Sequence, residues 1–209
     1  MIFALRVILA AALLVSSALA KSPEATFVYV PDLTQPDAGT LEGETWSRDS
    51  DTASLWLTRI DEATRTKFVQ RRAGLELDPF MTAPGRQTGG FLAFHVLVEN
   101  KTAARMVFQP QACRLRTSAE SFQAPLDLPT IMAVFSMMGR PAPDGIERIR
   151  GAIIDGEVIL GPGERRDGLF IFHTYDEPPK RYQIDIGATL TGGDPFGFSA
   201  HYRRVRVKP

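Results

Sequence analysis

Hydrophobic and polar residues alternate over much of this chain, and this period of two predicts β-strands. The clearest stretch is Gly90–Leu115. In its first half, one face would carry Leu92, Phe94, Val96 and Val98, and the other would carry Phe91, Ala93, His95, Leu97 and Glu99. Both faces are largely apolar, which indicates a central, buried strand.

Shorter runs of the same kind recur along the chain. We predict strands within Ala25–Val30, Arg105–Phe108, Ala112–Thr117, Ile149–Leu160, Gly168–Tyr175, Arg181–Leu190 and Phe198–Val207. The arginines of the last run favour an edge strand. We interpret Ser54–Arg72 as two strands joined near Asp61, with a short helix over Ser54–Ala63 as the alternative. Two stretches rich in turn-forming residues, Asp32–Asp51 and Leu75–Gly90, predict loops.

The spacing of these runs favours one architecture. About nine short strands follow one another without intervening helices, so a parallel sheet with crossover helices is not expected. We predict an all-β, immunoglobulin-like antiparallel β-sandwich, formed as a single domain by residues 21–209.

One segment departs from the alternation and predicts a short helical insertion at about 126–142. Asp127 or Leu128 can cap this helix, Pro129 suits its first turn and Gly139 suits its end. One stripe of the helix would carry Leu128, Ile131, Met132, Phe135 and Met138. Ala133, Val134 and Met137 would lie elsewhere, so the helix would be apolar almost all round and must be buried somewhere. It either plugs an open end of the sandwich or contacts a protein partner or an apolar ligand. The candidate interaction surface is Leu128, Ile131, Met132, Val134, Phe135, Met137 and Met138.

The N-terminal segment Met1–Ala20 has the pattern of a secretory signal peptide. Arg6 precedes a short apolar run, and Ala18-Leu19-Ala20 forms a cleavage motif. We therefore expect a secreted or periplasmic protein with no integral membrane segment after cleavage, although an uncleaved anchor stays open. Removing this segment changes 24 basic and 24 acidic residues to 23 and 24. This near-neutral balance argues against a nucleic-acid partner.

No motif in the sequence predicts catalysis or a cofactor. Cys113 alternates with Arg114 and is expected to be buried, like a small apolar residue. The histidines, His95, His173 and His201, lie on separate predicted strands without the spacing of a zinc site. Gly161 and Gly163 are interpreted as turn glycines followed by a solvated connection, Glu164–Asp167, because no phosphate-loop motif surrounds them. The acidic residues of the Asp32–Asp51 loop do not have the spacing of a calcium loop.

Part of the chain resembles a known family. The stretches "FHVLVENKTAARMVFQPQACRLRT", "LGPGERRDGLFIF" and "RYQIDIG" resemble the telokin-like immunoglobulin-fold domains of bacterial secreted proteins of unknown function. The resemblance covers roughly residues 90–190. It implies the sandwich fold and carries no catalytic residues to transfer.

Together these patterns favour a non-enzymatic, extracytoplasmic module that binds a protein partner or has a structural role. Two alternatives stay open. One is a carrier or chaperone for an apolar or lipid ligand, held between the sheets and closed in by the helix. The other is a hydrolase whose site is assembled from loops, with His95, His173 or His201 in a catalytic role.

Overall fold

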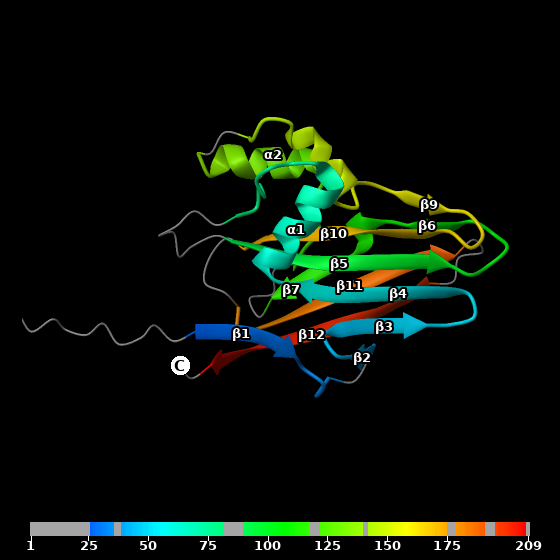
Figure 1. Cartoon of the computed structure of the whole chain (residues 1–209). Helices are drawn as coiled ribbons and strands as arrows, with labels where there is room; N and C mark the ends of the chain where they lie inside the picture. The colour runs from blue at the N-terminus through cyan, green and yellow to red at the C-terminus, as the bar shows by residue number, and fades with distance from the viewer. Residues whose placement is uncertain are drawn as a thin grey trace, which may run out of the picture.

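The structure is a computed structural model, and it describes residues 26–35, 39–81, 90–117, 122–139, 142–174, 179–190 and 195–207. Over these residues the protein is mostly β, with antiparallel pairing between its named strands and few helices (Figure 1). This confirms the all-β prediction. The expected signal peptide, Met1–Ala20, lies outside the described residues.

The strands form two sheets, which we call sheet A and sheet B. In sheet A the order is β1-β12-β11-β6-β9, and β7 pairs with both β11 and β8. In sheet B the order is β10-β5-β4-β3-β2. The strands of sheet A are β1 (Thr26–Pro31), β6 (Met106–Phe108), β7 (Arg114–Thr117), β8 (Phe122–Gln123), β9 (Val158–Leu160), β11 (Arg181–Leu190) and β12 (Pro195–Val207). Those of sheet B are β2 (Thr40–Glu42), β3 (Thr45–Asp49), β4 (Ala53–Ile60), β5 (Gly90–Asn100) and β10 (Arg165–Thr174).

The inward faces of both sheets meet in one apolar core. The period of two correctly identified the inward face of β5, because Phe94, Val96 and Val98 are fully buried. The facing residues follow the same alternation, and they include Phe170 and Phe172 of β10, Tyr182, Ile184 and Ile186 of β11, and Ala200 and Tyr202 of β12. Packing of this kind replaces the disulfides that a chain with one cysteine cannot form internally.

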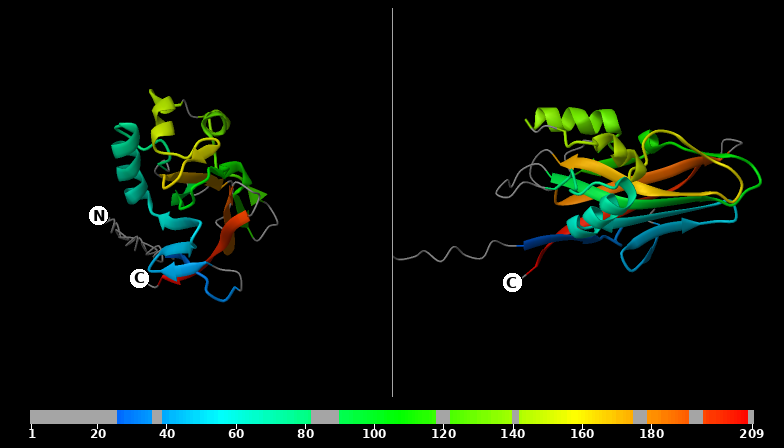
Figure 2. Two further views of the ribbon diagram at one scale, coloured as in Figure 1. Left: turned by 90° about the vertical axis from the view of Figure 1, so that its right-hand side faces the viewer. Right: turned by 45° about the horizontal axis from the view of Figure 1, so that its top comes forward.

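A third layer of helices covers part of the outer face of sheet B (Figure 2). It contains α1 (Glu62–Ala73), α2 (Leu128–Met137) and the 3-10 helix η2 (Ile146–Gly151), while a short 3-10 helix, η1 (Pro110–Ala112), precedes β7. These elements have a second apolar core, formed by Phe68, Val69, Phe80, Ile131, Phe135, Ile149 and Ile153 against Ala93, Leu169 and Ile171 of sheet B. The predicted insertion is therefore a packed part of a layer, and it does not plug an open end of the sandwich.

A buried ion pair closes this layer on the side of α1. Arg65 Nε donates to Asp78 Oδ2 at 2.7 Å, and Arg65 Nη2 donates to the Phe80 carbonyl at 3.0 Å. Both charged side chains are almost fully buried. The pair fixes the segment that follows α1 onto the helix, because separating the partners would leave an uncompensated buried charge.

Two segments were assigned wrongly from the sequence. Ser54–Arg72 contains β4 followed directly by α1, where two strands had been expected. The Asp61 carboxylate caps α1 by accepting a hydrogen bond from the Thr64 amide, and Gly74 ends the helix at φ +62°. In the predicted loop Asp32–Asp51, β2 and β3 form a hairpin around Gly43.

Two predictions about strand limits and positions were also wrong. The strand predicted at the edge, β12, pairs with β1 on one side and β11 on the other, so it is internal to sheet A. Arg165–Asp167, predicted as a solvated connection, already belongs to β10 and pairs with β5. The described residues form twelve strands, where about nine had been predicted.

The side of β10 that faces away from β5 is covered by the chain that surrounds α2 and η2. The Leu169 amide donates to the Ala152 carbonyl at 2.8 Å, and the Ile154 amide donates to the Leu169 carbonyl at 3.1 Å. Further along the strand, the Leu126 amide donates to the Ile171 carbonyl at 2.8 Å. The backbone groups on this side of β10 are therefore already paired along that stretch.

Candidate functional site

The predicted interaction surface on α2 is divided by the structure. Leu128, Ile131, Val134 and Phe135 have at most 5% of their surface exposed and belong to the packed interior. Met132 and Met137 are exposed by 46% and 68%, and Met138 is half-buried. Most of this surface is core, and two methionines of α2 are its strongly exposed members. The helix lies outside sheet B, so it does not close the space between the sheets.

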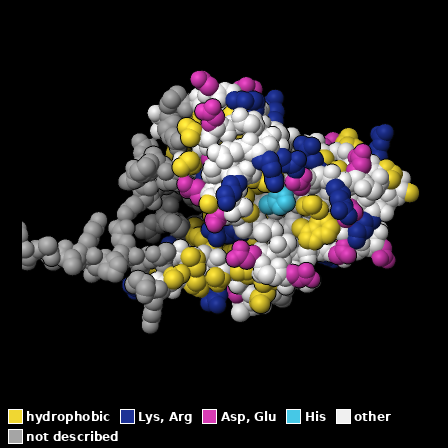
Figure 3. Space-filling model, viewed as in Figure 1, with side chains coloured by type: hydrophobic (Ala, Val, Ile, Leu, Met, Phe, Trp, Pro, Cys, Tyr) yellow, Lys and Arg dark blue, Asp and Glu magenta, His cyan; other side chains and the backbone are white. Residues whose placement is uncertain are grey.

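The more distinctive surface is the part of sheet B that the helices leave uncovered, which we call the open face. Strand register places two rows of residues on it. One row runs Ser47, Trp56, Leu97 and Asp167 across β3, β4, β5 and β10, and the next runs Asp49, Ser54, Glu99 and Arg165 across the same strands. In the space-filling view, hydrophobic surface lies beside a histidine over this sheet, with charged side chains around it (Figure 3).

Trp56 and Leu97 form the apolar centre of the open face. They are directly opposite each other on β4 and β5, and both are partly exposed. The other tryptophan, Trp46, points into the core between the sheets and is fully buried. A large indole ring left at the surface of a sheet is a frequent centre of binding energy in interfaces.

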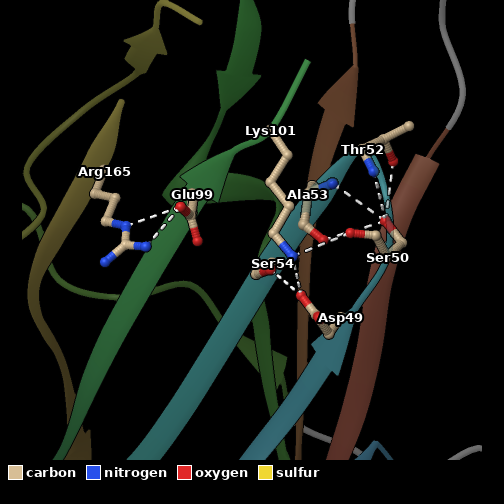
Figure 4. A network of polar contacts seen from close by, with 8 residues as sticks. All are labelled: Asp49, Ser50, Thr52, Ala53, Ser54, Glu99, Lys101 and Arg165. Carbon is tan, nitrogen blue, oxygen red and sulfur yellow. Dashed lines mark hydrogen bonds and ion pairs between the residues drawn. The ribbon is translucent and has the colours of Figure 1, made fainter. Parts of the chain in front are cut away.

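Two ion pairs lie beside this centre, and we call their four residues the charged frame. They are Asp49 with Lys101 and Glu99 with Arg165 (Figure 4). Lys101 Nζ is 2.5 Å from Asp49 Oδ1 and donates to the Ser50 carbonyl at 3.2 Å. Across the sheet, Arg165 Nε donates to Glu99 Oε1 at 2.8 Å. Hydrogen bonds from Lys101 and Ser54 hold the pKa of Asp49 below its usual value. The frame therefore consists of charges that already have partners.

The turn beneath Lys101 is held by its own hydrogen bonds. Ser50 Oγ accepts from the amides of Thr52 and Ala53 at 3.2 and 3.1 Å, and it donates to the Ala53 carbonyl at 3.1 Å (Figure 4). This arrangement fixes the position of the Ser50 carbonyl that Lys101 contacts. The ammonium is thereby located by two acceptors on the β3–β4 turn and strand end.

His95 and Asp167 connect the open face to the helical layer. His95 Nε2 is 3.2 Å from Asp167 Oδ2, and Asp167 also pairs with Arg72 at the end of α1. Partial burial opposes ionisation of Asp167, but the hydrogen bonds from Arg72 and His95 outweigh it and lower the pKa of the carboxyl. This contact links the C-terminal turn of α1 to the border of the open face.

The open face contains a hollow of about 480 Å³ lined by Asp49, Trp56, His95, Leu97, Glu99, Lys101 and Arg165. Its volume lies in the range typical of small-molecule sites. The lining has two carboxylates and two permanent cations, so its formal charge is zero when His95 is neutral. The hollow can therefore offer an apolar floor and fixed polar groups without a net charge.

The three histidines do not come together. His95 borders the open face of sheet B, and His173 is buried on β10 beside the Phe91 ring, where burial lowers its pKa. His201 lies on β12 and lines a hollow of about 290 Å³ beside sheet A, together with Asp32, Arg116 and Arg181. Within the described part of the chain, no group of three or more His, Cys, Asp or Glu side chains is arranged to hold a metal ion.

Cys113 and the acidic residues are placed as follows. Cys113 is fully buried in the core between the sheets, as its alternation predicted, and burial raises the pKa of its thiol to about 11. The acidic residues of the expected loop separate, because Asp32 contacts Thr34 beside sheet A while Asp49 faces Lys101 on sheet B. Asp37 lies outside the described residues. Gly163 adopts φ +70° between β9 and β10, as expected for a turn glycine.

Comparisons with known proteins give this chain no family. No protein-family model matches it, and no curated protein does. Among solved structures, it is similar to the yjhA protein of Bacillus subtilis, with 16% identity and a TM-score of 0.37 over 69% of this chain and 77% of that one. It is also similar to a Bordetella pertussis protein that bears the name ApaA, with 13% identity and a TM-score of 0.32 over 74% of this chain and 90% of the other. Likeness at this level leaves the site to be judged from its own residues.

In the described segments, no helix combines the length and the apolar character needed to cross a membrane.

The sequence missed the open face for an identifiable reason. Trp56 lies on one strand and Leu97 on another, and each follows the alternation of its own strand. They become neighbours on one face only through the pairing of β4 with β5, which the sequence does not reveal.

Proposed function

We propose that the protein is a non-enzymatic binding or structural module of immunoglobulin-like type, akin to the telokin-like domains, and that it acts outside the cytoplasm. Its partner docks on the open face of sheet B. The observation that carries this proposal is the apolar pair Trp56 and Leu97, which stays partly exposed beside ordered ion pairs. An aromatic centre with a polar rim is the usual anatomy of a binding surface.

The immunoglobulin-like assignment rests on two supports. Two antiparallel sheets share one core, and the stretches that resemble the family supply strands to both of them, from β5 through β11. The helical layer is an addition to that plan, and it shields the apolar outer face of β10 and of the first half of β5.

The location is tested by following the N-terminus. Expressed with its full sequence in a bacterium, the protein should be recovered from the periplasm or medium with Lys21 as its first residue, as read by mass spectrometry. Recovery from the cytoplasm with Met1–Ala20 retained would contradict the extracytoplasmic proposal.

The use of the open face is tested by cross-linking in the native cells. Cross-links formed by the native chain should disappear in Trp56→Ala and persist in Ile159→Ala, which removes an exposed side chain from β9 on the other sheet. Circular dichroism checks that both variants remain folded. Cross-links that survive Trp56→Ala, or that Ile159→Ala abolishes equally, would contradict docking on this face.

A further inference from the structure

We propose that the ligand of the open face is a neutral saccharide chain, with one sugar ring stacked on Trp56. This inference rests on the proposed function, since it names the chemistry of the partner that docks there. Its basis is the combination of an unused aromatic ring, a set of pre-paired charges, and a hollow of suitable size.

The Trp56 ring has recognition capacity that the fold does not use. Within the described part of the chain, its indole makes no hydrogen bond and no contact with another aromatic ring. In contrast, Trp46 is buried and its ring contacts that of Tyr202 at a centroid distance of 6.5 Å. A partly exposed indole offers both a flat apolar surface and an N–H donor to a ligand.

The charged frame selects against a charged ligand. Asp49 is already paired with Lys101, and Glu99 is already paired with Arg165. Because each of these groups already has a partner of opposite sign and the lining has no net charge when His95 is neutral, the hollow has no excess of either sign to attract an anion or a cation. The ligand that fits is neutral and forms hydrogen bonds with ionised groups that stay in their pairs.

Hydroxyl groups meet this requirement. Each hydroxyl can donate to a carboxylate and accept from an ammonium or guanidinium group, so one ligand can satisfy both signs of the frame. A wholly apolar ligand would instead cover these charged groups and remove them from water without replacing their hydrogen bonds.

A sugar ring has both properties that suit the open face, an apolar surface and hydrogen-bonding hydroxyls. Its C–H groups form a flat apolar surface for Trp56 and Leu97, and its hydroxyls project from the rim toward the frame. The hollow of about 480 Å³ lies open on the sheet surface and has room for a short stretch of chain.

The first test is native electrophoresis in gels that contain one polysaccharide each. The neutral probes are hydroxyethylcellulose, xylan, galactomannan and a mixed-linkage β-glucan, and alginate is the anionic control. We expect retardation by at least one neutral polymer, unchanged between low and high salt because no net charge is involved. Retardation by alginate alone, or retardation that salt abolishes, would overturn the inference.

Variants locate the interaction. Trp56→Ala should weaken binding by at least about tenfold, while Trp56→Phe keeps a ring and should lose less. Ile159→Ala should bind as the native protein does. A second measurement does not depend on the folding of a variant: titration of the native protein with oligosaccharides of the retarding polymer should shift its tryptophan fluorescence. Trp46 is buried, so Trp56→Phe should remove the shift.

The test separates this inference from the proposed function. If no neutral polymer binds but a cross-linked protein partner is lost in Trp56→Ala, the saccharide inference is wrong and the open face binds a protein surface. If a glycosylated partner is lost on enzymatic removal of its neutral sugars, the inference is supported. If neither saccharide nor partner depends on Trp56, both proposals are wrong.

Discussion

At the scale of single residues, Asn100 has a dense set of side-chain hydrogen bonds in the part of the chain that the structure describes. Its side chain is fully buried, and its Nδ2 lies 2.7, 3.1 and 2.9 Å from the carbonyl oxygens of Ala104, Leu160 and Gly161, so its two hydrogens are shared among three acceptors. Its Oδ1 accepts from the amide and hydroxyl of Thr102 at 3.0 and 2.8 Å. Because Asn100 ends β5 in sheet B and Leu160 ends β9 in sheet A, this one amide connects the two sheets.

Replacing Asn100 should be costly. Asn100→Ala removes the amide donor from the buried Leu160 carbonyl, weakens the contacts to Ala104 and Gly161 and leaves a cavity between the sheets, and we expect the free energy of unfolding to fall by about 3 kcal/mol. Asn100→Asp keeps the acceptor but turns a charge toward those carbonyls, and it should be at least as damaging. Urea unfolding followed by tryptophan fluorescence measures both, with the exposed Gln111→Ala as a control expected within about 0.5 kcal/mol of the native protein. A loss below about 1 kcal/mol for Asn100→Ala would contradict this role.

The sequence predicted some residues well and others only in part. Alternation with Arg114 was enough to place Cys113 inside, because inward and outward positions of a strand follow directly from parity. Parity does not say whether an outward position meets solvent or another layer. Ala93 and Leu97 share one face of β5, yet Ala93 is buried under the helices and Leu97 lies on the open face. That difference is decided by α1 and α2, which come from distant parts of the chain.

At the scale of elements, α2 shows how a helix that is apolar on every side is divided between core and surface. Its predicted stripe included Met132 and Met138, whereas the structure buries Val134 and leaves Met132 46% exposed. The helix is thus rotated relative to the prediction. Composition alone could not fix the rotation, because every side offered apolar residues to the interior.

This rotation gives a matched pair of substitutions on one helix. Ile131→Ala should destabilise the protein by about 2–5 kcal/mol because it leaves a cavity in the second core. Met132→Ala, one residue along, should change stability by less than about 0.5 kcal/mol. Thermal and urea unfolding of both variants check this, and equal effects would mean that α2 is packed differently.

Element types followed the sequence where one periodicity held throughout, and they failed where two met. The bounds expected for β11 are those observed, and the alternation predicted over Phe91–Glu99 lies within β5; both strands are long and alternate cleanly. Ser54–Arg72 failed because β4 passes into α1 with only Asp61 between them, without a glycine or proline to mark the change. The Asp61 cap, the adjacent buried pair Phe68 and Val69, and Gly74 at the end were the available signals of a helix.

At the scale of the whole molecule, the protein has three layers where the sequence indicated two. The strand pattern was enough to indicate an antiparallel arrangement, because short strands without intervening helices have few other ways to bury both faces. The third layer was not foreseen because α1 lies far from α2 and η2 in the chain and the three have no common signature.

The layered arrangement predicts the result of removing the insertion. A chain in which residues 126–142 are replaced by a Gly/Ser linker should expose the outer apolar surface of Leu169, Ile171 and Phe91, and it should bind a hydrophobic fluorescent dye strongly. The native protein and the double variant Met132→Ser/Met137→Ser should bind little dye, since both keep the layer closed. A deleted chain that stays folded with unchanged dye binding would show that the layer does not depend on α2.

The backbone contacts along the outer side of β10 affect how readily copies of this protein associate through their sheet edges. An uncovered border strand of ten residues could recruit the same strand from a neighbour, and such recruitment repeats without limit in fibrils. Here Ala152, Ile154 and Leu126 occupy those positions, and sheet B ends on its opposite side in the three-residue β2. These two features shorten the stretch of sheet B along which the strand of another copy could pair, and we expect them to limit edge-to-edge association through this sheet.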